Sequence, residues 1–173
     1  MTGATGAPSR RVCGLLARVA LIVLCVGTMT GTGWAQDDKP TARQIAAVRA
    51  CADKNQNDIT KAERQCLFNL VATPCQSTPE GQSNLGMADC FRLEATIWGD
   101  LLNENYKRLR NDLDETQIAG LRDMQRAWIV SRDSTCGFYD VRIHGSMAVP
   151  MQAACVARET ARRALLLKFF GGL

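Results

Sequence analysis

The 173-residue sequence contains one histidine, His144, and its eight cysteines include no Cys-x-x-Cys pair. A structural zinc site needs closely spaced cysteines or histidine partners, and a thioredoxin-like redox centre needs Cys-x-x-Cys. The sequence also contains no nucleophile elbow and no phosphate-binding loop. We therefore expect no metal, no cofactor, no catalytic residue and no enzymatic activity. We interpret His144 as a surface residue in a glycine-containing loop.

The apolar run near the N-terminus, VALIVLCV at residues 19–26, is too short for a comfortable membrane span. Three arginines precede it, and the small residues Gly33 and Ala35 follow at the −3 and −1 positions of a cleavage site. This order predicts a signal peptide over residues 1–35. We expect a periplasmic or secreted protein with no stable membrane span after signal removal.

The chain lacks a strong net charge once this segment is removed, because the formal charge falls from +4 to +1. So small a charge gives no general basic surface, and we expect no nucleic-acid partner. Residues 75–141 carry 7 basic and 11 acidic side chains, whereas residues 142–173 carry 5 and 1. These opposite charges are consistent with docking of the two segments, the commoner arrangement, and also with a polar binding face.

Removal of the signal peptide leaves six cysteines, and an even number in an exported chain predicts three disulfides. Pairing in sequence order would close one expected loop with each bond, stabilising the fold by about 3 kcal/mol per loop. For the first pair an alternative stays open, since Cys75 is also a possible partner of Cys51. The pairs in sequence order are Cys51 with Cys66, Cys75 with Cys90, and Cys136 with Cys155.

Helical periodicity runs through the chain, and no alternating strand pattern longer than chance is present. A short helix is expected from Thr41, and a second from a Thr60–Glu63 capping box through Val71. The pattern then predicts a long helix from residues 84–87 to about 113, a partner over 115–138 capped by Asp114 and Gln117, and a last helix near Pro150.

The break of a few residues between the two long helices predicts an antiparallel helical hairpin. The fold class is therefore all-α: a disulfide-stapled helical bundle built on this hairpin plus a C-terminal helix. A short N-terminal helix pair is expected over residues 36–74, before a main helical domain over residues 75–173.

Two motifs in the hairpin carry a family resemblance: LNxxYxxL at residues 102–109 and QRAWIxxRDxxC at residues 125–136, followed by Cys155. Over roughly residues 75–170 the chain resembles the lysozyme inhibitor LprI-like family of small exported helical bacterial proteins. The resemblance implies inhibition of a lysozyme. The motif residues singled out are Asn103, Tyr106, Gln125, Trp128, Arg132 and Asp133.

Tyr106 and Trp128 fall on the inward stripes of the hairpin, so we expect them in the core rather than in an exposed hot spot. Buried polar groups need hydrogen-bond partners, which predicts a network of Asn103, Tyr106, Gln125 and Arg132 between the helices. In this network Arg132 would pair with Asp100 or Glu104. The motif is then structural.

Two loops closed by the expected disulfides, residues 77–84 and 142–146, are the candidate tips for occluding the cleft of a target enzyme; the alternative is that they are solvated turns without a binding role. Their disulfides would lower the ordering cost of binding. The expected partner is lysozyme or another cell-envelope protein. The alternative is a periplasmic envelope interaction or structural module without lysozyme inhibition. The candidate contact residues are Ser77, Glu80, Asn84, Arg142, His144 and Ser146.

Overall fold

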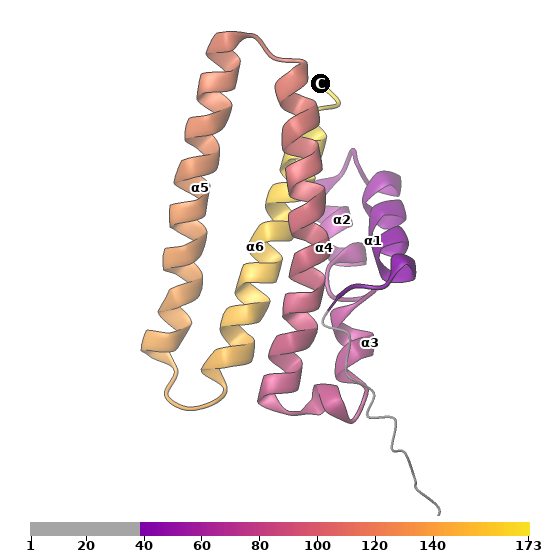
Figure 1. Cartoon of the computed structure of the whole chain (residues 1–173), viewed down its shortest axis with the longest axis vertical. Coiled ribbons are helices and arrows are strands. Elements are labelled where there is room, and N and C mark those ends of the chain that lie inside the picture. The colour runs from indigo at the N-terminus through magenta and orange to yellow at the C-terminus, as the bar shows by residue number, and fades with distance from the viewer. Residues whose placement is uncertain (1–38) are drawn as a thin grey trace, which may run out of the picture. The chain divides into compact units, whose positions relative to one another are not determined.

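The computed structural model describes residues 39–173, so the expected signal peptide lies outside the described residues. The described part contains helices and turns and no strand, which confirms the all-α prediction. Figure 1 shows the elements: α1 (Ala42–Lys54), α2 (Ile59–Cys66), α3 (Ala72–Gln76), a 3-10 turn η1 (Glu80–Gln82), α4 (Asn84–Asn111), α5 (Glu115–Arg142) and α6 (Ala148–Phe170).

The two longest helices, α4 and α5, form the predicted antiparallel hairpin, with 28 residues in each arm. The capping box at the start of α5 is present: Gln117 N–H donates to the Asp114 carboxylate, and the Gln117 side chain accepts from Asp114 N–H. The apolar stripes of the two arms do not pack mainly on each other. They pack on α6, which contacts both arms (Figure 1).

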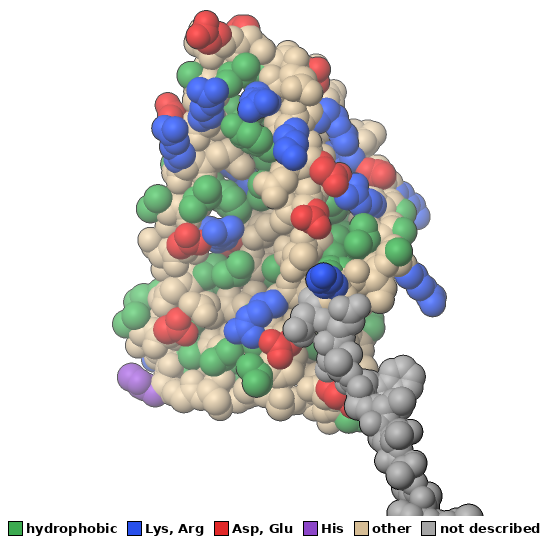
Figure 2. Space-filling view, viewed as in Figure 1, with side chains coloured by type: hydrophobic (Ala, Val, Ile, Leu, Met, Phe, Trp, Pro, Cys, Tyr) green, Lys and Arg blue, Asp and Glu red, His purple; other side chains and the backbone are tan. Residues whose placement is uncertain are grey.

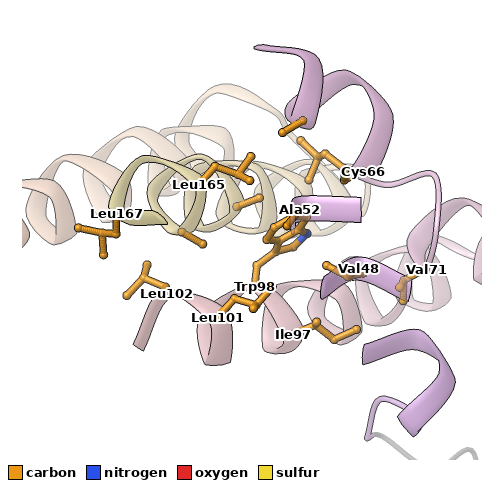
Figure 3. Close-up of a cluster of buried hydrophobic side chains, with 14 of the residues drawn as sticks. Val48, Ala52, Cys66, Val71, Ile97, Trp98, Leu101, Leu102, Leu165 and Leu167 are labelled. Atoms are coloured by element: carbon orange, nitrogen blue, oxygen red, sulfur yellow. The ribbon is translucent and has the colours of Figure 1, made fainter. Parts of the chain in front are cut away.

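The C-terminal helix α6 is the central helix because it buries small side chains on more than one side, among them Ala157, Ala161 and Ala164. Alanines let α4 approach closely, and the Asn105 side-chain amide donates to the Ala164 carbonyl at 3.0 Å inside the contact. Trp98 is fully buried in the adjoining core. Figure 3 shows it among side chains from three parts of the chain: Val48, Ala52, Cys66, Val71, Ile97, Leu101, Leu102, Leu165 and Leu167.

The N-terminal helix pair supplies the ionic partners of α6. Lys168 lies 2.6 Å from Asp53 of α1, and Arg162 lies 2.6 Å from Glu63 of α2. No ion pair in the described part joins α6 to the acidic hairpin. The two segments do dock, as expected, but no ion pair joins them in these residues: apolar packing, hydrogen bonds and the Cys136–Cys155 disulfide hold α6 on the hairpin.

The second helix differs from its prediction at both ends. Asp58 is the N-cap, in place of Thr60, and α2 ends at Cys66. Phe68 follows with φ +66°, a left-handed conformation that is strained for a bulky side chain. Pro74 lies in the first turn of the next helix, α3, where its missing N–H is not needed.

A buried carboxylate holds this irregular connection in place. Glu94 of α4 is 0% exposed and accepts three hydrogen bonds: from Phe68 N–H at 2.7 Å, Ala72 N–H at 2.9 Å and Trp98 Nε1 at 3.0 Å. Without this carboxylate, each of the three N–H groups would lack a hydrogen-bond acceptor in the core. Glu94 thereby fixes the strained Phe68 backbone to the main helix.

The three disulfides join the cysteines in sequence order, as the loop argument predicts: Cys51–Cys66, Cys75–Cys90 and Cys136–Cys155. The first holds α1 to α2, the second holds α3 to α4, and the third holds α5 to α6. Cys75 therefore does not reach back to Cys51. Each bond closes one turn between neighbouring helices.

Replacing Glu104 with glutamine is expected to lower the free energy of unfolding near neutral pH by less than about 1 kcal/mol, as for other exposed ion pairs. The carboxylate accepts from Arg49 Nη1 at 2.6 Å, with side chains 38% and 44% exposed. This hydrogen bond lowers the pKa of Glu104. The stabilisation is therefore complete above the pKa of the unfolded chain and is lost as the pH falls through the lower folded-state pKa.

Thermal melts of the two proteins across the acid range measure this effect. The difference in Tm should shrink below about pH 4, where the carboxylate begins to be protonated. A difference that stays constant down to complete protonation would contradict the assignment.

Candidate functional site

The two loops closed by the second and third disulfides meet at one end of the bundle, which we call the stapled end (residues 77–86 and 138–151; Figure 1). The Asn84 side-chain amide donates to Ser146 Oγ at 2.7 Å, joining the start of α4 to the α5–α6 loop. Sequence reasoning named both residues but could not place them together, because they are 62 positions apart.

Glycines let the first loop lie directly against the helices on either side of it, α3 and α4. A Cβ at Gly86 would fall 1.9 Å from the Glu80 carbonyl oxygen, and one at Gly81 would fall 2.3 Å from the Cys75 carbonyl oxygen. Neither approach is possible for a larger residue without moving backbone. Ser83 Oγ accepts from Gly86 N–H at 2.9 Å and caps α4. The loop is thus fixed at its base by backbone contact as well as by a disulfide.

The second loop is also held against the helices on either side of it, α5 and α6. Gly145 adopts φ +100°, which favours glycine, and the turn leads directly into α6. Beside it, the Gln152 side chain donates to Asp140 at 2.7 Å across the ends of α5 and α6. Together with Cys136–Cys155, this contact holds the loop against both of its helices.

Large apolar side chains are exposed around the stapled end. Leu85 is 63% exposed beside Asn84, and Met147 is 47% exposed beside Ser146. Phe138 and Val141, near the end of α5, are 60% and 71% exposed. Figure 2 shows hydrophobic side chains on the lower part of the face in view, interspersed with acidic and basic ones. Several large apolar side chains exposed on a rigid support are typical of a binding surface.

Most of the other candidate contact residues in the two loops are exposed. Ser77, Glu80 and His144 are open to solvent, and Arg142 is exposed at the last position of α5. Asn84 is half-buried because it contacts the second loop. None of the exposed apolar residues was proposed from the sequence, although a leucine after a helix cap and a methionine before a helix are visible there.

The family motif forms a second surface, an open groove of about 340 Å³ between α4 and α5 with α6 as its floor. Tyr106 and Trp128 pack against the core but are only half-buried, with one side in the wall of the groove, so the prediction that both lie in the core is met in part. The reason is that α6 holds the two arms apart. The lining residues are Gly99, Leu102, Asn103, Tyr106, Gln125, Trp128, Ile129, Arg132 and Thr160.

The polar motif residues do not form the expected network between α4 and α5. Asn103 is exposed, and Gln125 accepts a hydrogen bond from Arg163 of α6. Arg132 pairs with neighbouring Asp133 at 2.8 Å and lies 4.9 Å from the Trp128 ring. The prediction that Arg132 pairs with Asp100 or Glu104 is thus wrong; Glu104 forms its ion pair with Arg49 of α1.

A helical domain with three disulfides and an exposed, rigid apolar end belongs to the class of small extracytoplasmic proteins stabilised by disulfides. Residues 75–167 match the family model described as Lysozyme inhibitor LprI. The chain belongs to this lysozyme inhibitor LprI family.

Neither the curated proteins nor the solved structures contain a match to the chain. Among residues 39–173, no helix has the length and apolar character needed to cross a membrane. The same residues contain no group of three or more His, Cys, Asp or Glu side chains placed to hold a metal ion.

Proposed function

We propose that the protein is an exported inhibitor that binds a lysozyme and occludes its substrate cleft with the stapled end. Membership of the lysozyme inhibitor LprI family supports the target class. The hydrogen bond from Asn84 to Ser146 carries the assignment of the surface, because it unites the two disulfide-held loops into one rigid end. The proposal includes the signal peptide over residues 1–35, a periplasmic or secreted location, and binding without catalysis.

The physical case rests on preorganisation and apolar area. Two loops that are already ordered lose little conformational freedom on binding, so more of the contact energy contributes to affinity. Leu85 and Met147 flank the hydrogen bond between the loops and are the exposed apolar anchors nearest to it in the chain. Burial of a few such anchors accounts for most of the affinity in typical protein interfaces.

A lysozyme activity assay with the oxidised protein tests this proposal. Saturable inhibition of at least one lysozyme class is expected. The double variant Leu85→Glu/Met147→Glu should raise the inhibition constant by roughly 30-fold or more, since each change places a charge in the contact. Both positions are exposed, so the fold should be unaffected.

Val130→Glu is the matched control. Val130 is 67% exposed on α5, outside the stapled end, so this variant should inhibit like the parent. Absence of inhibition against every lysozyme class at micromolar excess would reject the target. Equal loss in the control and in the double variant would reject the surface.

A further inference from the structure

Two arginines lie close to Trp128, one of the aromatic residues that line the groove between α4 and α5. The guanidinium carbon of Arg132 lies 4.9 Å from the centre of the Trp128 ring, and that of Arg163 lies 5.6 Å from it. The two arginines come from different helices, α5 and α6. Cation–π contact with tryptophan is favourable, but it does not neutralise either charge.

Of the two arginines, Arg163 gives the stronger indication of an anionic ligand. It is 7% exposed, forms no ion pair in the described part of the chain, and has a buried Nη2 with no hydrogen-bond partner. Its Nε donates to Gln125, which lines the groove. Burial lowers the pKa of this guanidinium. A buried cation without an anion is costly, and an apolar side chain of similar volume would serve stability better.

Arg132 stands at the rim of the same groove with a replaceable partner. Asp133, its ion-pair partner, is the next residue in α5 and has a side chain that is 58% exposed. The Arg132 side chain is 24% exposed, and a pair with one solvent-exposed partner contributes little stability, so an incoming carboxylate can take the place of Asp133 at small cost. Arginine binds a carboxylate well because its N–H donors match the two oxygens.

The remaining lining is mostly apolar and aromatic, with a few polar groups. Leu102, Tyr106 and Ile129 supply the apolar walls, and Thr160 supplies a hydroxyl at the floor. The volume, about 340 Å³, falls within the range of small-molecule sites. The groove therefore suits a compact ligand with one anionic end and one apolar end.

We propose that this groove binds a small organic carboxylate with an apolar body. Arg132 holds the carboxylate at the rim, the unpaired charge of Arg163 attracts it from beneath Trp128, and the body of the ligand lies between Tyr106 and Trp128. This site is separate from the stapled end, and the proposal does not rest on lysozyme inhibition.

Phenylacetate is a suitable probe, and its neutral amide, phenylacetamide, is the matched control ligand. Titration into the oxidised protein is followed by the NMR signals of the tryptophan indole N–H groups, assigned with Trp128→Phe. The Trp128 signal should shift saturably with phenylacetate. The Trp98 signal should stay in place, because its N–H donates to Glu94 in the core. Phenylacetamide should bind about tenfold more weakly, because it loses the charge-assisted hydrogen bonds.

Two variants test the arginines directly. Arg132→Gln and Arg163→Met should each weaken phenylacetate binding by about tenfold or more. Their controls are Arg126→Gln, which removes an exposed arginine on the same helix as Arg132, and Arg162→Gln, which removes the neighbour of Arg163 that pairs with Glu63 and Glu159. Neither control should change the binding of phenylacetate.

A stability measurement separates this role from a purely structural one. Arg163→Met should keep or raise the Tm, because it removes a buried charge without an anion. Equal binding of amide and carboxylate, or no saturable shift of Trp128, would overturn the proposal. So would a lower Tm for Arg163→Met combined with unchanged phenylacetate binding by Arg132→Gln.

Discussion

Replacing Glu94 with alanine is expected to remove most of the free energy of folding. The change leaves Phe68 N–H, Ala72 N–H and Trp98 Nε1 without an acceptor in a fully buried site. Each unsatisfied donor costs about 1–3 kcal/mol, and small proteins have only about 5–15 kcal/mol in total. The strained Phe68 backbone also loses the contact that holds it.

Urea unfolding followed by near-ultraviolet circular dichroism measures the effect. Glu94→Gln should be intermediate: it keeps the oxygen for some donors but turns an N–H group toward another. Asp100→Ala, which removes an exposed acid from the same helix, should change the midpoint little. An alanine variant as stable as the Asp100 control would show that Glu94 does not hold the connection together.

Removing the Cys136–Cys155 disulfide, by replacing both cysteines with alanine, is expected to have the second largest effect. In α5 only Leu121 and Cys136 are buried, so the disulfide is the main attachment of its C-terminal half to α6. Loss of a loop closure of this size lowers stability by about 3 kcal/mol in the chain-entropy model. We expect the loss of stability to appear mainly as local unfolding of the C-terminal half of α5.

Hydrogen exchange measured by mass spectrometry locates the change. Amides of residues 126–147 should lose protection, while those of α4 near Trp98 should keep most of theirs. The Cys51–Cys66 double alanine variant is the control, because it removes a bond of similar loop length from α1 and α2. Protection of α5 equal to that of the parent would contradict the assigned role.

The features that the sequence predicted well are set by neighbouring residues. The start of α4 near residue 84 and the capping box of α5 depend on hydrogen bonds between residues three positions apart, so local contacts fix them. The disulfides follow for the same reason, since each bond joins cysteines on either side of one turn. The all-α class then follows from helical periodicity along the whole chain.

The features that the sequence did not predict depend on which helix lies between which others. The position of α6 between the hairpin arms determines how far Trp128 and Tyr106 are buried. The sequence of an alanine-rich helix does not identify which of its sides will contact which neighbouring helix. Glu94 was missed because an acidic residue inside a helix ordinarily faces water. Arg132 was given the wrong partner because the facing helix was assumed to be in contact with it.

The consecutive pairing of the cysteines has a consequence for how the chain acquires its bonds. Six cysteines allow 15 pairings, yet here the first joins the second, the third joins the fourth and the fifth joins the sixth along the described chain. If translocation delivers the N-terminus first, each bond can close before the next pair has crossed the membrane. On this proposed export route the order of arrival would favour the native set, and a thiol oxidant would have few mispaired intermediates to leave behind.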